Sequence, residues 1–224
     1  MSSYRPLVAL LVTLAACAPD RLTHVDGAAT GATVASTAGP VDASTSADGS
    51  GDDDPHFLQT AAGAPTIANP VISFWAKRGV KQTVEMYYHR ESGGRDSIPF
   101  FSLRLRERSL WRRPDGTAFA NGDSVLITLT LVDAEHGIVD CQPSGLRFAD
   151  GDPARVKISF FHDDDDLNHD GVVNGTDTAL ASTLQIWRKE SASEPWLSVK
   201  SKVSDGPREV EADINGFTGY AIAW

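Results

Sequence analysis

Apolar and polar residues alternate along much of the chain after residue 80, which is the period of a β-strand that buries one face. The clearest runs are residues 101–105, 125–131 and 156–160. Weaker runs predict further strands near residues 80–89, 184–189, 197–203, 209–214 and 220–224. Clusters of Gly, Pro, Asp and Asn separate the runs, and the one helix that we expect is short, at about residues 176–182. The pattern predicts an all-β fold, an antiparallel β-sandwich.

The first third of the chain has a different composition. Residues 18–69 are rich in Ala, Gly, Ser, Thr and Asp and almost lack large apolar side chains. Such a segment cannot bury enough surface to offset the entropy of ordering, so we expect a disordered tether. Residues 70–224 are enough for one domain with its own core. The boundary between tether and domain is therefore expected at residue 70.

The N-terminus has the pattern of an export signal. Arg5 precedes an apolar run at residues 7–16, which is too short to span a bilayer as a helix. Leu14-Ala15-Ala16-Cys17 resembles the lipobox of bacterial lipoproteins, and an ordinary secretory signal is the alternative. The resemblance implies that residues 1–16 are a signal peptide, that Cys17 is lipidated, and that residues 17–69 tether the domain to a membrane. Ala18, in place of Asp, at the second position fits sorting to the outer membrane, which places the protein in the cell envelope.

With Cys17 lipidated, Cys141 has no disulfide partner. We expect Cys141 to be a small buried strand residue.

Acidic residues concentrate in one short segment. The chain has a formal net charge of −10, yet residues 70–224 carry 18 Lys and Arg against 23 Asp and Glu. Six of those acids lie between Asp163 and Asp177 with no Lys or Arg among them, so the rest of the domain is nearly balanced. This local excess of negative charge is what an ion site predicts.

The spacing within that segment fits a hard cation such as Ca²⁺. A calcium loop places oxygen side chains at positions 1, 3 and 5, a glycine at 6, a backbone carbonyl at 7, and further oxygens at 9 and 12. Counted from Asp166, the glycine is Gly171, and the ligands are Asp166, Asn168, Asp170, Val172 through its carbonyl, Asn174 and Asp177. An acidic, solvated turn between strands is the alternative interpretation.

The loop resembles the calcium loop of dockerin modules, from which it departs by having His169 in place of a small residue at position 4. Dockerins carry two such loops, and we find one, so docking to a cohesin is not supported. We expect the loop and its helix, at about residues 162–183, to be an insertion between two strands and the ion to be structural. Without a cation the clustered carboxylates would repel one another.

The domain also resembles a ZU5-type β-sandwich. The resemblance lies in Pro114-Asp115-Gly116-Thr117, Pro143-Ser144-Gly145-Leu146-Arg147-Phe148 and Gly216-Phe217-Thr218-Gly219-Tyr220-Ala221. It implies a non-catalytic adhesion or scaffold module. Some ZU5 proteins cleave themselves at a His-Phe-Ser motif; here Gly216 replaces the histidine that would activate the nucleophile, so we do not expect self-cleavage.

No enzyme motif is found, and the histidines lack ligand spacing, so we expect no catalysis and no nucleic-acid partner. Two alternatives stay open. Trp187 and Trp196 flank an expected hairpin and are candidates for contact with a cell-surface polysaccharide, although packing is the commoner use of such residues. The chain could also be an accessory to an envelope hydrolase, which would require a concave pocket with a convergent acid and base.

Overall fold

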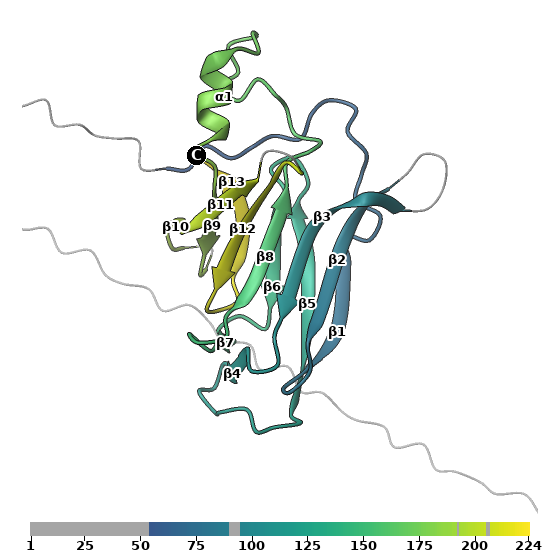
Figure 1. Ribbon diagram of the computed structural model, residues 1–224, viewed down its shortest axis with the longest axis vertical. Coiled ribbons are helices and arrows are strands. Elements are labelled where there is room, and N and C mark those ends of the chain that lie inside the picture. Colours follow the sequence, from purple (N-terminus) through teal and green to yellow (C-terminus); the bar gives the residue numbers. More distant parts are fainter. Residues whose placement is uncertain (1–53, 90–94, 192, 205–206) are drawn as a thin grey trace, which may run out of the picture. The chain divides into compact units, whose positions relative to one another are not determined.

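The computed structural model describes residues 54–89, 95–191, 193–204 and 207–224, and Figure 1 shows two facing sheets in this part of the chain. Every strand pairing is antiparallel. The six-stranded sheet has the order β1 (Val71–Lys77), β5 (Ser124–Asp133), β6 (Ile138–Gln142), β13 (Gly219–Ala223), β9 (Gln185–Lys189) and β10 (Leu197–Val199). The five-stranded sheet has the order β11 (Ser201–Ser204), β12 (Glu209–Ile214), β8 (Ala154–Ser159), β3 (Arg95–Leu105) and β2 (Gln82–His89). The expected all-β antiparallel sandwich is confirmed.

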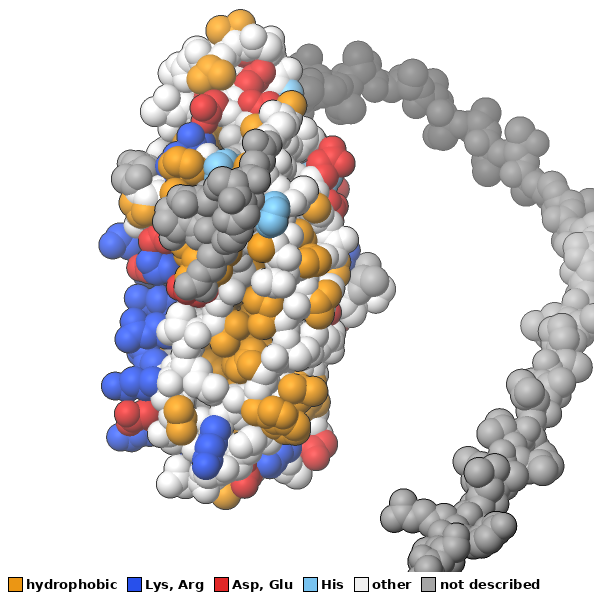
Figure 2. Space-filling model, turned by 90° about the vertical axis from the view of Figure 1, so that its right-hand side faces the viewer, with side chains coloured by type: hydrophobic (Ala, Val, Ile, Leu, Met, Phe, Trp, Pro, Cys, Tyr) orange, Lys and Arg blue, Asp and Glu red, His pale blue; other side chains and the backbone are white. Residues whose placement is uncertain are grey.

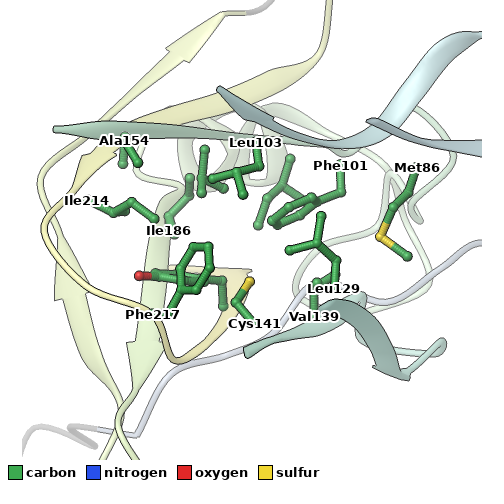
Figure 3. Packing of buried hydrophobic residues seen from close by; sticks show 14 of the residues in the cluster. Met86, Phe101, Leu103, Leu129, Val139, Cys141, Ala154, Ile186, Ile214 and Phe217 are labelled. Atoms are coloured by element: carbon green, nitrogen blue, oxygen red, sulfur yellow. The ribbon is translucent and has the colours of Figure 1, made fainter. Parts of the chain in front are cut away.

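The core lies between the two sheets, where the alternating apolar residues meet. Phe101 and Leu103 of β3 point toward Leu129 of β5 and Val139 of β6 (Figure 3). Cys141 of β6 is fully buried and unpaired, as expected for a small strand residue. Burial raises the pKa of its thiol well above the usual range. Apolar burial on both inner faces is the main stabilising contribution to such a sandwich.

Some strands depart from the periodicity. The run at residues 197–203 is divided: β10 belongs to the six-stranded sheet and β11 to the other, so the chain crosses between sheets at Lys200. Strands β1 and β6 were not expected. In β1 two of the four outward residues, Val71 and Trp75, are apolar and exposed, which weakens the polar half of the alternation. A short sheet of β4 (Leu110–Arg112) and β7 (Arg147–Phe148) completes the strands.

The packed domain begins before residue 70, which corrects the expected end of the tether. Leu58 is buried, and its backbone N–H donates to the carbonyl of Ile222 at 3.2 Å. Phe57 forms an isolated antiparallel β-bridge with Ala223, and Ile67 forms another with Tyr88. The composition of this stretch is poor in apolar residues, but backbone pairing with distant strands orders it. Residues 1–53, including Cys17 and the expected signal peptide, lie outside the described residues.

The expected insertion follows β8 and precedes β9. It contains the acidic loop and the helix α1 (Gly175–Ala181), close to the expected residues 176–182. Figure 1 shows α1 beyond one end of the strands, with β4 and β7 near the opposite end. Among the described residues, no helix is long and apolar enough to span a bilayer.

The outer face of the five-stranded sheet is charged. Figure 2 shows Lys and Arg side chains gathered along one side of the domain. On β8, Arg155 and Lys157 pair with the acids of β12, and on β3 Arg104 is exposed between the buried residues Leu103 and Leu105. This is the solvent-facing half of the alternation along these strands.

Candidate metal centre

The acidic loop turns its oxygen side chains onto its own backbone. Asp166 accepts from the backbone N–H of Gly171 at 2.7 Å and from that of Asp170 at 3.1 Å. Asp170 in turn accepts from the N–H of Val172 at 2.9 Å. Oxygens held in this way lie along the inside of a tight turn, because the N–H groups that they accept from belong to the same loop.

The side chains at positions 1, 3 and 5 form one network. The N–H of Asp170 is shared, since Asn168 Oδ1 also accepts from it at 3.1 Å. Asn168 Nδ2 donates to the carboxylate of Asp170 at 3.1 Å. The structure thus links Asp166, Asn168 and Asp170 by hydrogen bonds. Their role as ion ligands stays a prediction.

The backbone of the loop needs a glycine at position 6. Gly171 has φ +86°, a left-handed conformation that side chains with a Cβ rarely adopt. A Cβ added there would meet no atom within 4 Å, so the requirement is conformational and not one of space. His169 also has positive φ, +55°.

Asn174 joins the loop to the helix. It is the N-cap of α1, and its Oδ1 accepts from the N–H of Thr176 at 2.7 Å. Its Nδ2 donates to the carbonyl of Val172 at 2.9 Å. Positions 7 and 9 of the loop are therefore in contact with each other.

Asp177 closes the loop from inside the first turn of α1. It is 3% exposed, and its carboxylate accepts from the N–H groups of Asn174 at 2.8 Å, Leu167 at 2.9 Å and Asn168 at 3.4 Å. These hydrogen bonds lower the pKa of Asp177 below its ordinary value, and the bond from Asn174 has the largest effect. Asp177 is charged at neutral pH and ties the start of the loop to the helix.

Leu167 anchors this arrangement, and sequence analysis did not single it out. Its side chain is buried in the core cluster while its N–H meets Asp177. The sequence does contain a signal for its burial, because Leu167 is the one large apolar residue between Asp163 and Asp170.

No base neutralises the loop. Within the described part of the chain, Asp166, Asp170 and Asp177 form no ion pair with Lys, Arg or His. The neighbouring residue Asp165 does form an ion pair, in which its carboxylate lies 2.7 Å from the guanidinium of Arg208. Asp163 is not part of this hydrogen-bond network. Burial raises the pKa of its carboxyl to about 7, although the positive charge of Arg208 acts in the opposite direction.

The residues present fit a calcium ion in the chemistry of their donors. All six predicted ligands offer oxygen, which Ca²⁺ prefers, and none is a soft sulfur or nitrogen donor. Among the described residues, no three His, Cys, Asp or Glu side chains converge closely enough to hold a metal ion. The carboxylates hold backbone N–H groups instead, so an ion would have to draw Asp166, Asp170 and Asp177 closer together.

The tryptophans that flank the expected hairpin are both half-buried. The hairpin itself is present, since β9 pairs with β10. Trp187 donates its indole N–H to the carbonyl of Ala223 at 3.2 Å, and Trp196 packs edge-on to Phe57 at 5.0 Å. Their proposed contact with a polysaccharide stays a prediction.

Thr218, in the segment compared with the self-cleavage motif, is buried. Among the described residues its hydroxyl has no hydrogen-bond partner, so no base contacts it. A threonine hydroxyl without a base is a poor nucleophile.

Comparisons with protein-family models, with curated proteins and with solved structures find no match for this chain. The resemblances to dockerin loops, ZU5-type sandwiches and lipoproteins therefore stay predictions from the sequence.

Proposed function

We propose that this chain is a non-catalytic, lipid-anchored protein of the cell envelope, whose β-sandwich acts as an adhesion or scaffold module and carries a structural calcium loop. The observation that carries the proposal is the network at residues 166–177. Carboxylates, amides and a glycine stand at the spacing of a calcium loop, and hydrogen bonds link these side chains to the loop backbone. Among the described residues no base pairs with Asp166, Asp170 or Asp177.

The ion would be held by oxygens of Asp166, Asn168, Asp170, Asn174 and Asp177 and by the carbonyl of Val172. Bound Ca²⁺ supplies positive charge that several carboxylates share. Each carboxylate oxygen that accepts one N–H keeps a second lone pair, so the existing hydrogen bonds leave acceptor capacity for a cation.

The role of the ion would be structural. Asp166 begins the loop and Asp177 lies in α1, so a shared cation would fix the direction of the helix relative to β8. A single loop with Asp at position 12 in an extracellular setting is typical of weak sites, with a Kd of about 10⁻⁴–10⁻³ M.

Calorimetry and thermal melting of the full chain test the calcium site. We expect heat on titration with millimolar Ca²⁺ and a melting temperature that rises with Ca²⁺ and falls with chelator. The matched control is Asp115→Asn, which removes another turn carboxylate, one that accepts from the N–H of Thr117 at 2.8 Å. The proposal fails if wild-type protein gives no heat and no shift.

The anchor is tested separately in a bacterial host. We expect the full chain to fractionate with the outer membrane and to incorporate labelled fatty acid, and Cys17→Ser to lose both properties. A Cys141→Ser variant is the control, because Cys141 is a core residue of β6. Incorporation of label by Cys17→Ser would contradict the anchor.

A further inference from the structure

An open pocket of about 410 Å³ adjoins the acidic loop. This volume lies within the range of small-molecule sites, about 300–1,000 Å³. Its walls come from four segments that are distant in sequence: the stretch before β1, the turn between β5 and β6, the acidic loop, and the end of β13. The lining includes His56, Phe57, His136, Asn168, His169 and Trp224.

Among the described residues, the lining includes no Asp, Glu, Lys or Arg side chain. This contrasts with the whole sequence, of which 22% is Asp, Glu, Lys or Arg. The polar lining consists of imidazoles and carboxamides, which donate and accept hydrogen bonds without a fixed charge. Such a pocket suits an uncharged ligand with many hydroxyl groups, because no formal charge has to be matched or desolvated.

The aromatic rings of Phe57 and Trp224, together with Pro55 and Leu167, form the rest of the wall. Trp224 stacks on His56 with ring centroids 5.5 Å apart and an angle of 17° between planes. Phe57 lies edge-on to His136 at 6.2 Å and to Trp196 at 5.0 Å. Rings combined with planar polar groups match a ligand that has both apolar C–H faces and hydroxyl edges.

The ring of His136 is held by a contact with Asp133. Its Nδ1 lies 2.9 Å from a carboxylate oxygen of Asp133, outside the set of lining residues. That contact fixes the ring and leaves Nε2 as its second polar atom.

From these observations we infer that the pocket binds a neutral saccharide and that calcium in the adjoining loop strengthens this binding. The second part rests on the proposed calcium site. Asn168 is a predicted ligand at position 3, and His169 follows it with φ +55°, so the same two residues belong to the loop and to the pocket wall. An ion that fixes the loop would fix that wall, and binding would be coupled in both directions.

The test uses the full chain and a panel of neutral hexasaccharides, namely cellohexaose, xylohexaose and chitohexaose, with hexagalacturonate as the charged comparison. We expect at least one neutral member to bind in calorimetry and hexagalacturonate not to bind. Binding should tighten about fivefold or more when millimolar Ca²⁺ replaces chelator.

Variants locate the site. Trp224→Ala removes a pocket ring and should weaken binding about tenfold. Trp75→Ala is the matched control, since Trp75 is 64% exposed on β1 and does not line the pocket. Because Trp224 also packs against the core, His169→Asn provides a second variant: it removes an exposed ring, suits positive φ and is not a predicted ion ligand.

The two proposals fail separately. Binding of no neutral hexasaccharide, or equal weakening by Trp75→Ala, overturns the saccharide site even if Ca²⁺ binds. Binding that is unchanged by calcium in a protein that does bind calcium overturns the coupling. If calorimetry shows no calcium binding while saccharide binding depends on Trp224 and His169, the calcium loop fails and the saccharide site stands.

Discussion

Two groups of carboxylates in this protein are stabilised in different ways. On β12, Asp213 and Glu209 face bases of the neighbouring strand β8: Arg155 Nε lies 2.8 Å from Asp213, and Lys157 pairs with Glu209. In the loop, the hydrogen-bond partners of Asp166, Asp170 and Asp177 among the described residues are backbone N–H groups and Asn168. The neighbouring strand β8 supplies basic partners for the acids of β12, whereas the loop keeps its net negative charge.

The difference indicates where a mobile cation could act. Backbone N–H groups stabilise a carboxylate by hydrogen bonding but bring no net charge, so the repulsion among the loop acids remains. The acids of β12 need no ion, because each of them already lies near Arg155 or Lys157. We therefore expect calcium to change the behaviour of the loop and to leave the sheet unaffected.

The largest expected effect is that of Asp177→Asn. The amide loses the charge and presents N–H groups to backbone donors, so we expect the calcium-dependent rise in melting temperature to disappear and the melting temperature without calcium to fall. Asp213→Asn is the matched control on β12 and should keep the calcium response. A full calcium response in Asp177→Asn would break the comparison.

Asp163 is a third kind of carboxylate, half-buried and with no ion pair or hydrogen-bond partner for its side chain in the described part of the chain. Its pKa of about 7 in the fold lies above its ordinary value, because burial disfavours the charged form. A raised folded pKa means stability that is present at low pH and is lost as pH rises from about 4 to about 7. Above that window the loss is constant.

Asp163→Asn should remove this pH dependence. The free energy of unfolding of the variant, measured with urea, should exceed that of wild type by on the order of 3 kcal/mol at pH 8 and by much less at pH 4. Asp213→Asn should show the opposite trend, since hydrogen bonding to Arg155 lowers the pKa of Asp213 and its stabilising effect is lost only as pH falls below about 4. Parallel profiles for the two variants would contradict the assignment.

Gly171→Ala tests the backbone of the loop. At φ +86° an alanine is strained by about 1–2 kcal/mol, although nothing lies close enough to clash with its Cβ. We expect that loss in the free energy of unfolding, together with weaker calcium binding. Gly151→Ala is the control, since Gly151 does not have positive φ and also has open space around its Cβ. Equal losses in both variants would show that the loop backbone is not special.

What the sequence could predict depends on how local each feature is. Period-two alternation located β3, β5 and β8, because it is set within a few residues. The loop spacing pointed to residues that share one hydrogen-bond network at 166–177, and their role as ion ligands stays a prediction. The packing of Phe57 and Leu58 could not be predicted in this way, since it depends on pairing with Ala223 and Ile222 at the other end of the chain. The saccharide pocket combines such distant segments, so only the fold could bring its walls together.

The smallest expected effect is at the paired acids. Arg155→Met removes the partner of Asp213, whose side chain is 43% exposed, and a pair with this exposure is worth about 0.5–1 kcal/mol. We expect a loss of that size in the free energy of unfolding at low ionic strength and a smaller loss in 1 M salt, because solvent ions screen exposed charges. Calcium should not compensate for the loss, since Asp213 belongs to a strand and offers no gathered set of oxygens. If millimolar Ca²⁺ restored the stability of Arg155→Met, a general excess of negative charge would account for the calcium response, and the loop would have no special role.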